Sequence, residues 1–195
     1  MSKKIKENKK PKKNINEKKK PLEKNSNGII FDFSCPTAFY SCNIKNQFTN
    51  LLKNPKEFVD IRRTIFGEAL TYFNKTNINE LEKNKKNTHT HVISDSKIGL
   101  VEKILTELFK IVYNNSEEIE KIVDNYISGD IWQIGYKKGL RFIGVRDDNI
   151  FNVLFIDYHH LLEPDKNYNQ PDYYKYKYCP MTSGYCNECI KIAKK

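Results

Sequence analysis

The sequence predicts an α+β domain in which N-terminal helices pack on a C-terminal antiparallel sheet. Apolar residues recur at helical spacing in the first part of the chain, and the apolar period changes to two from Ile131 onward. Short polar turns separate the alternating segments of this second part, as in hairpins. With 195 residues, the chain is expected to form one folded domain.

A short strand and a capped helix open the predicted domain. The apolar run at residues 28–33 predicts a first strand or the entry into the core. Asn54, followed by a proline and by Glu57, predicts a helix start with a capping box. The same cap signature recurs at Asn77 and Glu80 and predicts a second, shorter helix.

Two further helices are predicted before the sheet. Residues 95–113 carry one apolar stripe, formed by Val101, Ile104, Leu105, Leu108 and Val112. Residues 115–127 have two glutamates in the first turn and an apolar face, and Gly129 ends this helix. Both apolar faces are expected to pack on the sheet.

The second half predicts a three-stranded antiparallel meander over residues 131–136, 140–146 and 150–157. Residues 137–139 and 147–149 have the composition of hairpin turns. The last strand is apolar on both faces over most of its length, which is typical of a central strand.

The remaining segments predict a disordered basic tail at residues 1–28 and a Tyr/Cys-rich C-terminal arm at residues 165–195, on either side of a domain at 29–164. Residues 1–25 contain eleven lysines and three glutamates, so they carry +8 of the net charge of +10. Clustered lysines bind phosphate backbones without sequence preference. The other interpretation is a solvated tail that reflects a chain rich in lysine and asparagine throughout.

Composition excludes several classes of protein. No apolar run reaches 18 residues, and residues 1–25 lack the apolar stretch of a secretory signal. The five cysteines are an odd number and too sparse for a disulfide framework. We therefore expect a cytoplasmic protein that does not associate with membranes.

Residues 141–160 carry a pattern that is similar to a group of small, uncharacterised bacterial proteins. Arg141 opens an Arg-aromatic-x-Gly hairpin, a Phe-x-Val-Leu strand follows, and Asp157 and His160 form an Asp-x-x-His at the strand end. This group resembles the RelE/ParE superfamily of toxins, whose fold is a helical pair followed by a curved antiparallel sheet. The resemblance covers residues 30–164 in outline.

The resemblance implies a metal-independent endoribonuclease toxin that acts on messenger RNA at the ribosome and is neutralised by a small antitoxin protein. Such cleavage needs a base for the ribose 2′-hydroxyl, a cation for the phosphorane and an acid for the leaving 5′-oxygen. The candidates are Arg141, Arg146, His160 and one of His89 and His91, with His91 taken into the set. No cofactor is expected for catalysis.

Strand geometry bears on the two arginines. Arg141 and Arg146 are five residues apart and point to opposite faces of a regular strand, unless a bulge near Gly144 re-aims one of them. We favour Arg141 as the phosphate clamp and His160 as general acid or base, on a concave wall of the sheet. The structural alternative stays open: Asp157 and His160 cap the turn that follows, and Arg141 pairs with a neighbouring carboxylate.

Two basic or aromatic segments are candidates for nucleic-acid contact. Lys137 and Lys138 lie in the first predicted hairpin turn. Tyr174, Lys175 and Tyr176 belong to an alternation of tyrosine and lysine that suits stacking on single-stranded bases. The same alternation also fits an edge strand.

The cysteines allow a structural zinc site. Cys186 and Cys189 form a Cys-x-x-Cys, and Cys179 precedes it. A tetrahedral site wants four ligands, so the fourth would be Cys35, Cys42 or a histidine. The alternative is free thiols. The competing function is accordingly a non-catalytic module that binds nucleic acid or protein, with or without zinc.

Overall fold

The computed structural model describes residues 28–83, 88–114, 117–137, 139–164, 169 and 171–182. Its centre is a five-stranded sheet. In spatial order the strands are β1 (Ile30–Asp32), β7 (Ile150–Asp157), β6 (Arg141–Asp147), β5 (Ile131–Gly135) and β4 (His91–Val92). A separate hairpin pairs β2 (Asn43–Ile44) with β3 (Phe48–Thr49).

The predicted meander is confirmed, and the prediction of an all-antiparallel sheet is wrong. Strands β5, β6 and β7 pair antiparallel in sequence order. The N-terminal strand β1 lies parallel to β7, with Ile30 opposite Ile150, and makes the sheet mixed. A parallel neighbour requires a long crossover connection, so no local turn signal in the sequence announces it.

The predicted helix starts at Asn54 and Asn77 are also present, whereas the helix predicted from residue 115 begins at Ile119. Helix α1 (Pro55–Arg63) begins at Asn54, whose side chain accepts a hydrogen bond from the Glu57 backbone N–H at 3.0 Å. The helix continues through a π-helical turn, η1 (Thr64–Ala69), into α2 (Leu70–Phe73). The remaining helices are α3 (Ile78–Lys83), α5 (Asp95–Tyr113), α6 (Ile119–Ile127) and the short 3-10 helix η2 (Pro171–Lys175).

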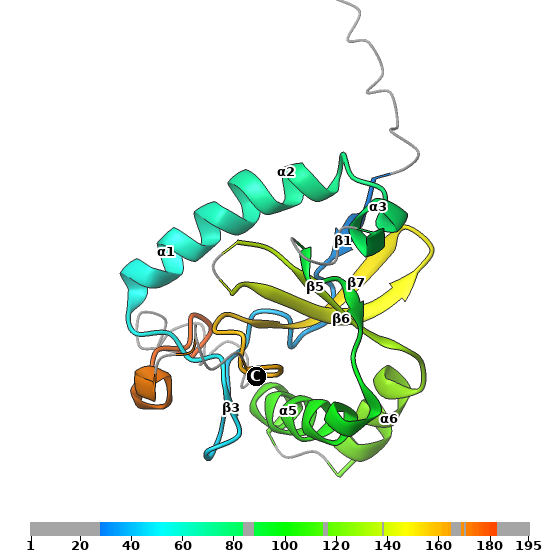
Figure 1. Cartoon of the computed structure of the whole chain (residues 1–195). Coiled ribbons are helices and arrows are strands. Elements are labelled where there is room, and N and C mark those ends of the chain that lie inside the picture. The colour runs from blue at the N-terminus through cyan, green and yellow to red at the C-terminus, as the bar shows by residue number, and fades with distance from the viewer. Residues whose placement is uncertain are drawn as a thin grey trace, which may run out of the picture.

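Helices cover both faces of the sheet, which therefore has two hydrophobic cores (Figure 1). On one face, α5 and α6 pack through Leu105, Leu108 and Val123 against Ile143 and Leu154. On the other face, Ile65 of η1, Phe73 of α2 and Leu81 of α3 pack against the sheet residues Phe142 and Phe151. The structure confirms the α+β class, and the finer prediction of a RelE-like arrangement stays a prediction.

A β-bulge explains why the last strand is apolar on both faces. Ile143 pairs with Phe155, but Gly144 pairs with Val153, so Leu154 is the extra residue on β7. Leu154 and Phe155 both join the core under α5. The bulge lies in β7, and β6 keeps its alternation, so Arg141 and Arg146 point to opposite faces.

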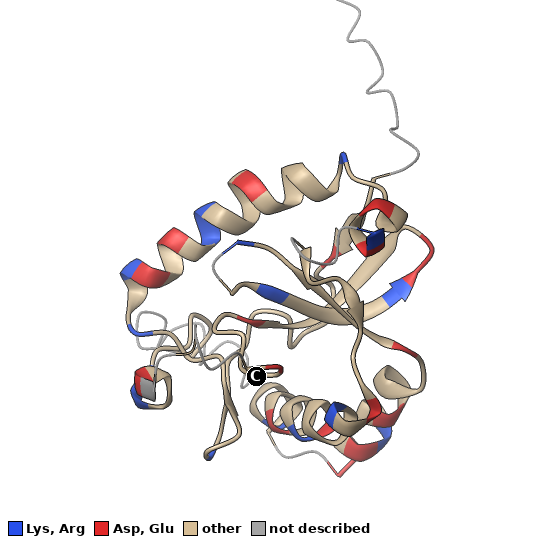
Figure 2. Cartoon of the chain, viewed as in Figure 1, with Lys and Arg blue, Asp and Glu red and all other residues tan. Residues whose placement is uncertain are grey.

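The described part of the C-terminal segment packs on the domain. Leu52 and Tyr178 exchange backbone hydrogen bonds of 2.8 and 3.0 Å, and Cys179 is buried. Residues 1–27 of the predicted basic tail and the residues after Thr182 lie outside the described residues, whereas Gly28, which the prediction placed in the tail, is buried. No helix in the described ranges is long and apolar enough to cross a membrane. Basic and acidic residues alternate along the outer helices (Figure 2).

Candidate functional site

Polar side chains gather at one end of the sheet, from elements far apart in sequence. We call this set the sheet-end cluster, and it comprises His89, His91, Gln133, Arg141, Asp157, His160 and Glu163. Register places His91 opposite Gln133, and Arg141 opposite both Gly135 and Asp157. The cluster therefore unites three of the four predicted catalytic residues, Arg141, His91 and His160.

Two histidines face each other at the cluster's outer side. The ring centroids of His89 and His160 are 6.0 Å apart. His89 is exposed and His160 is half-buried. Both residues adopt positive φ, 46° at His89 and 58° at His160, a region that residues other than glycine seldom occupy. The structure thus favours His89 over His91 as the histidine beside His160.

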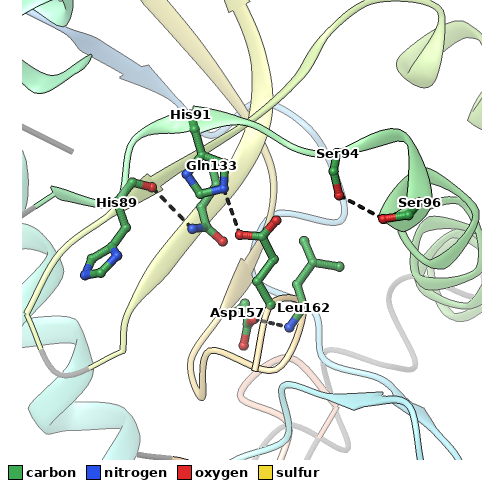
Figure 3. A network of polar contacts seen from close by, with 8 residues as sticks. His89, His91, Ser94, Ser96, Gln133, Asp157 and Leu162 are labelled. Atoms are coloured by element: carbon green, nitrogen blue, oxygen red, sulfur yellow. Dashed lines mark hydrogen bonds and ion pairs between the residues drawn. The ribbon is translucent and has the colours of Figure 1, made fainter. Parts of the chain in front are cut away.

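His91 has a different partner. Its Nε2 lies 2.7 Å from Glu163 Oε2, and about 30% of each side chain is exposed (His91 30%, Glu163 27%). Figure 3 shows His91 reaching from its strand toward the turn that follows Asp157. The expectation that His91 acts beside His160 is corrected by this ion pair, which joins β4 to the segment after β7.

Arg141 is buried, which corrects the expectation of an exposed phosphate clamp. Only 4% of the residue is accessible, and Nη1 donates to the backbone carbonyls of Tyr136 and Leu140. Burial lowers the pKa of the guanidinium, and the nearby carboxylates of Asp157 and Glu163 act in the opposite direction. Its Nε has no hydrogen-bond partner among the described residues.

Asp157 is fully buried and caps the turn that follows β7, as the structural alternative proposed. Its carboxylate oxygens accept hydrogen bonds from the backbone N–H groups of His159 at 3.1 Å and Leu162 at 2.8 Å. Burial raises the pKa of the carboxyl group, and these N–H donors oppose that shift. His160 lies within the turn that Asp157 holds.

Arg146 is not part of the sheet-end cluster. It lies on the opposite face and at the other end of β6, where its guanidinium stacks 5.3 Å from the centre of the Trp132 ring. Nη1 binds Glu82 of α3 at 3.0 Å. Arg141 and Arg146 point to opposite faces, as their five-residue spacing predicts, because the bulge lies in β7 and leaves the alternation of β6 intact.

The structure describes four of the five residues predicted to contact nucleic acid. Lys137 pairs with Glu68 at 3.0 Å and remains 65% exposed, whereas Lys138 lies outside the described residues. Lys175 pairs with Asp172 within its own helix. Tyr174 and Tyr176 are half-buried, and Tyr176 meets His159 edge-on. These tyrosines therefore do not form an open stacking platform.

Of the predicted zinc ligands, the structure describes only Cys179 and the two cysteine candidates for the fourth position, Cys35 and Cys42. Cys179 is buried, as are Cys35 and Cys42, whereas Cys186 and Cys189 lie outside the described residues. No group of three potential metal ligands occurs within the described ranges. Burial raises the pKa of the Cys42 thiol to about 12, and nearby Glu107 and Cys179 act in the same direction.

Sequence reasoning did not find Gln133 and Glu163. Gln133 is fully buried, and its Nε2 donates to the His89 carbonyl at 3.3 Å. Its signal was a single polar residue within the apolar strand β5. Glu163 had no local signal, because its partner His91 is 72 residues away.

Two comparisons with known proteins point to the same family. A family model described as "Uncharacterised protein UU032" matches residues 34–185. A protein of that name from Ureaplasma parvum serovar 3 is 29% identical over 187 residues, which cover 93% of this chain and 95% of the relative. No solved structure matches, and neither sequence comparison links the chain to the RelE/ParE superfamily. The chain belongs to the family of proteins described as UU032.

Proposed function

We propose that this protein is an RNA-directed endoribonuclease that cleaves without a metal, with His89 and His160 as its acid–base pair. The observation that carries the proposal is the pair of imidazole rings, whose centroids are 6.0 Å apart. The pair lies at the end of the sheet where His91, Glu163 and Asp157 also lie. In this proposal the phosphodiester docks across the outer edges of both rings, because centroids 6.0 Å apart leave no room for a phosphate between them. Imidazole exchanges protons near neutral pH and serves either role.

The proposed reaction is transesterification within the RNA. One histidine takes the proton of a ribose 2′-hydroxyl, and the 2′-oxygen forms a bond to the adjacent phosphorus. The bond from phosphorus to the 5′-oxygen breaks, and the second histidine supplies the proton of the leaving group. The products are a 2′,3′-cyclic phosphate and a 5′-hydroxyl, and no external reactant is consumed.

The cation for the phosphorane comes from the β5–β6 turn in this proposal. Gly139 lies against His160, because a Cβ built on it would be 3.5 Å from the His160 Cβ. Lys137 is two residues away, and its exposed ion pair with Glu68 is the kind that exchanges readily. Arg141 contributes a fixed positive charge from within the domain and does not grip the phosphate.

The proposed setting is the cytoplasm, where messenger RNA or the ribosome is the target and a small antitoxin protein is the inhibitor. The basic segment at residues 1–25 adds sequence-independent attraction to RNA. The target and the inhibitor are proposed from the resemblance to RelE/ParE toxins. Both assignments are wrong if the protein does not cleave RNA.

Cleavage is tested with purified full-length protein and RNA in the presence of EDTA, with both product ends mapped. We expect cyclic phosphate and 5′-hydroxyl ends, and a loss of about 100-fold or more in rate for His89→Ala and His160→Ala. His159→Gln is the control, since its amide can still donate to the Leu51 carbonyl that His159 Nε2 contacts at 2.7 Å, and position 159 lies outside the pair. Equal rates for parent and both alanine variants would falsify the proposal.

A second candidate is a non-catalytic RNA-binding module with a structural zinc ion. The burial of Arg141 favours it, because the residue predicted to clamp phosphate is withdrawn from the surface. Cys179, Cys186, Cys189 and Cys42 are the thiols for the metal, since Cys42 and Cys179 lie close enough for their charges to interact. RNA binding with no cleavage, together with stoichiometric zinc by elemental analysis, would establish this function in place of the first.

A further inference from the structure

Both histidines of the pair are held by buried polar side chains from the sheet. His160 belongs to a turn in which Asp157 binds the backbone on either side, at His159 and at Leu162. The amide of Asn169 donates to the carbonyls of His159 at 2.7 Å and His160 at 3.3 Å. The backbone around His160 is therefore tied from within the domain and from the segment that follows.

His89 is held in the same manner by Gln133. The Gln133 side chain is fully buried, and its only hydrogen bond among the described residues goes from Nε2 to the His89 carbonyl. The other polar atom of this side chain, Oε1, is buried and has no hydrogen-bond partner among the described residues. Burial of an unpaired amide oxygen is destabilising, so packing alone would favour an apolar residue at this position of the strand.

Positive φ makes this support necessary. A non-glycine residue at positive φ is strained and persists only where its surroundings fix it. His89 at 46° and His160 at 58° are two of five such residues in the described chain, and their rings face each other. Each has a buried polar side chain of the sheet bonded to its own backbone or to the adjacent residue.

We propose that Gln133 and Asp157 are positioning residues that set the distance and orientation of the His89–His160 pair. They contact no substrate and act only through the backbone of the two histidine segments. This inference rests on the proposed function for its catalytic meaning, but the geometry it assigns can be measured without RNA.

The test is Gln133→Leu, which keeps side-chain size and removes the hydrogen bond to His89. We expect kcat for RNA cleavage to fall about tenfold while KM stays within about twofold, because misplaced groups lose reactivity before they lose substrate affinity. In NMR spectra the nuclear Overhauser contacts between the His89 and His160 rings should weaken. Asp157→Asn keeps one acceptor oxygen but turns an N–H donor toward the other backbone N–H group, so it should weaken the ring contacts as well.

Thr37→Val is the matched control. Thr37 is fully buried, and its hydroxyl donates to the Leu154 carbonyl at 2.7 Å, so this variant also removes a buried side-chain-to-backbone bond to the sheet. We expect it to lower the free energy of unfolding while kcat and the ring contacts stay unchanged. If the leucine variant does not fold, Gln133→Met takes its place.

The outcomes separate the two proposals. Ring contacts that persist unchanged in the Gln133 variant overturn the positioning role, whatever the activity. Ring contacts that weaken while even the parent leaves RNA intact support the positioning role and overturn the nuclease. A fall in kcat with weakened contacts supports both.

Discussion

At the scale of single residues, two fully buried polar side chains, Thr37 and Asn50, bind backbone carbonyls of the irregular strand β7. Leu154 is the bulged residue of β7, and the Thr37 hydroxyl donates to its carbonyl. Asn50 donates to the Ile156 carbonyl at 2.9 Å and accepts from the Cys42 N–H at 2.8 Å. Because an unpaired buried backbone group is costly, these side chains explain how so irregular a strand remains buried.

Cys42 gives a prediction at this scale. Burial raises the pKa of its thiol from 9.0 to about 12, so the folded state retains the thiol proton over a range in which the unfolded chain loses it. The stabilisation is complete below pH 9 and is lost as the pH rises toward 12. Between pH 8 and pH 10, the free energy of unfolding should fall by about 1 kcal/mol more in the parent than in Cys42→Ala. Urea unfolding at both pH values measures the difference, and parallel pH dependences would contradict it.

At the scale of elements, two glycines have opposite surroundings. Gly99 lies within α5, and a Cβ added there would meet no atom within 4 Å. Gly144 lies opposite the bulge, and a Cβ there would be 2.1 Å from the Asn152 carbonyl oxygen. The first glycine weakens a helix without a visible packing reason, and the second allows two backbones to approach closely.

We therefore expect opposite effects of alanine at these positions. Gly99→Ala should raise the free energy of unfolding by about 1 kcal/mol, because alanine loses less conformational freedom in a helix. Gly144→Ala should lower it by about 3 kcal/mol or more, because the bulge must shift. Chemical denaturation of the two variants beside the parent decides the matter. A destabilising Gly99→Ala would show that the open space beside α5 is filled by another part of the molecule.

At the scale of the whole molecule, charge and fold are separate properties. Residues 1–25 carry +8, and the rest of the chain carries only +2. The helices that cover the sheet present both signs of charge (Figure 2). Sequence-independent attraction to RNA is therefore expected to come mainly from the basic segment, while any chemistry belongs to the sheet end.

A salt titration tests this separation. For the full chain, the logarithm of the RNA association constant should fall steeply with the logarithm of the salt concentration, since bound lysines release counterions. Deletion of residues 1–25 should remove most of that slope and leave the cleavage rate at saturating RNA within about twofold. An unchanged slope after deletion would place the binding surface on the folded domain.

Several features of the fold were predictable because their causes are local. The cap at Asn54, the stripe of α5 and the meander of β5, β6 and β7 all appeared as predicted. The parallel pairing of β1 with β7 joins residues 120 positions apart, and no local pattern encodes it. The sequence also did not predict that helices cover both faces of the sheet. Periodicity tells which residues of a helix are buried, but it does not tell which face of the sheet they pack against.

The candidate site also has features that local sequence predicts and features that depend on distant segments. The sequence alone determined that Arg141, Asp157 and His160 stand at strand ends, and that histidines at positions 89 and 91 precede a helix. Only the tertiary structure decided that Arg141 is buried, that Glu163 takes His91, and that His89 faces His160. Local spacing fixes the direction of a side chain along its own strand, whereas burial and partners depend on segments that return from far away in the chain.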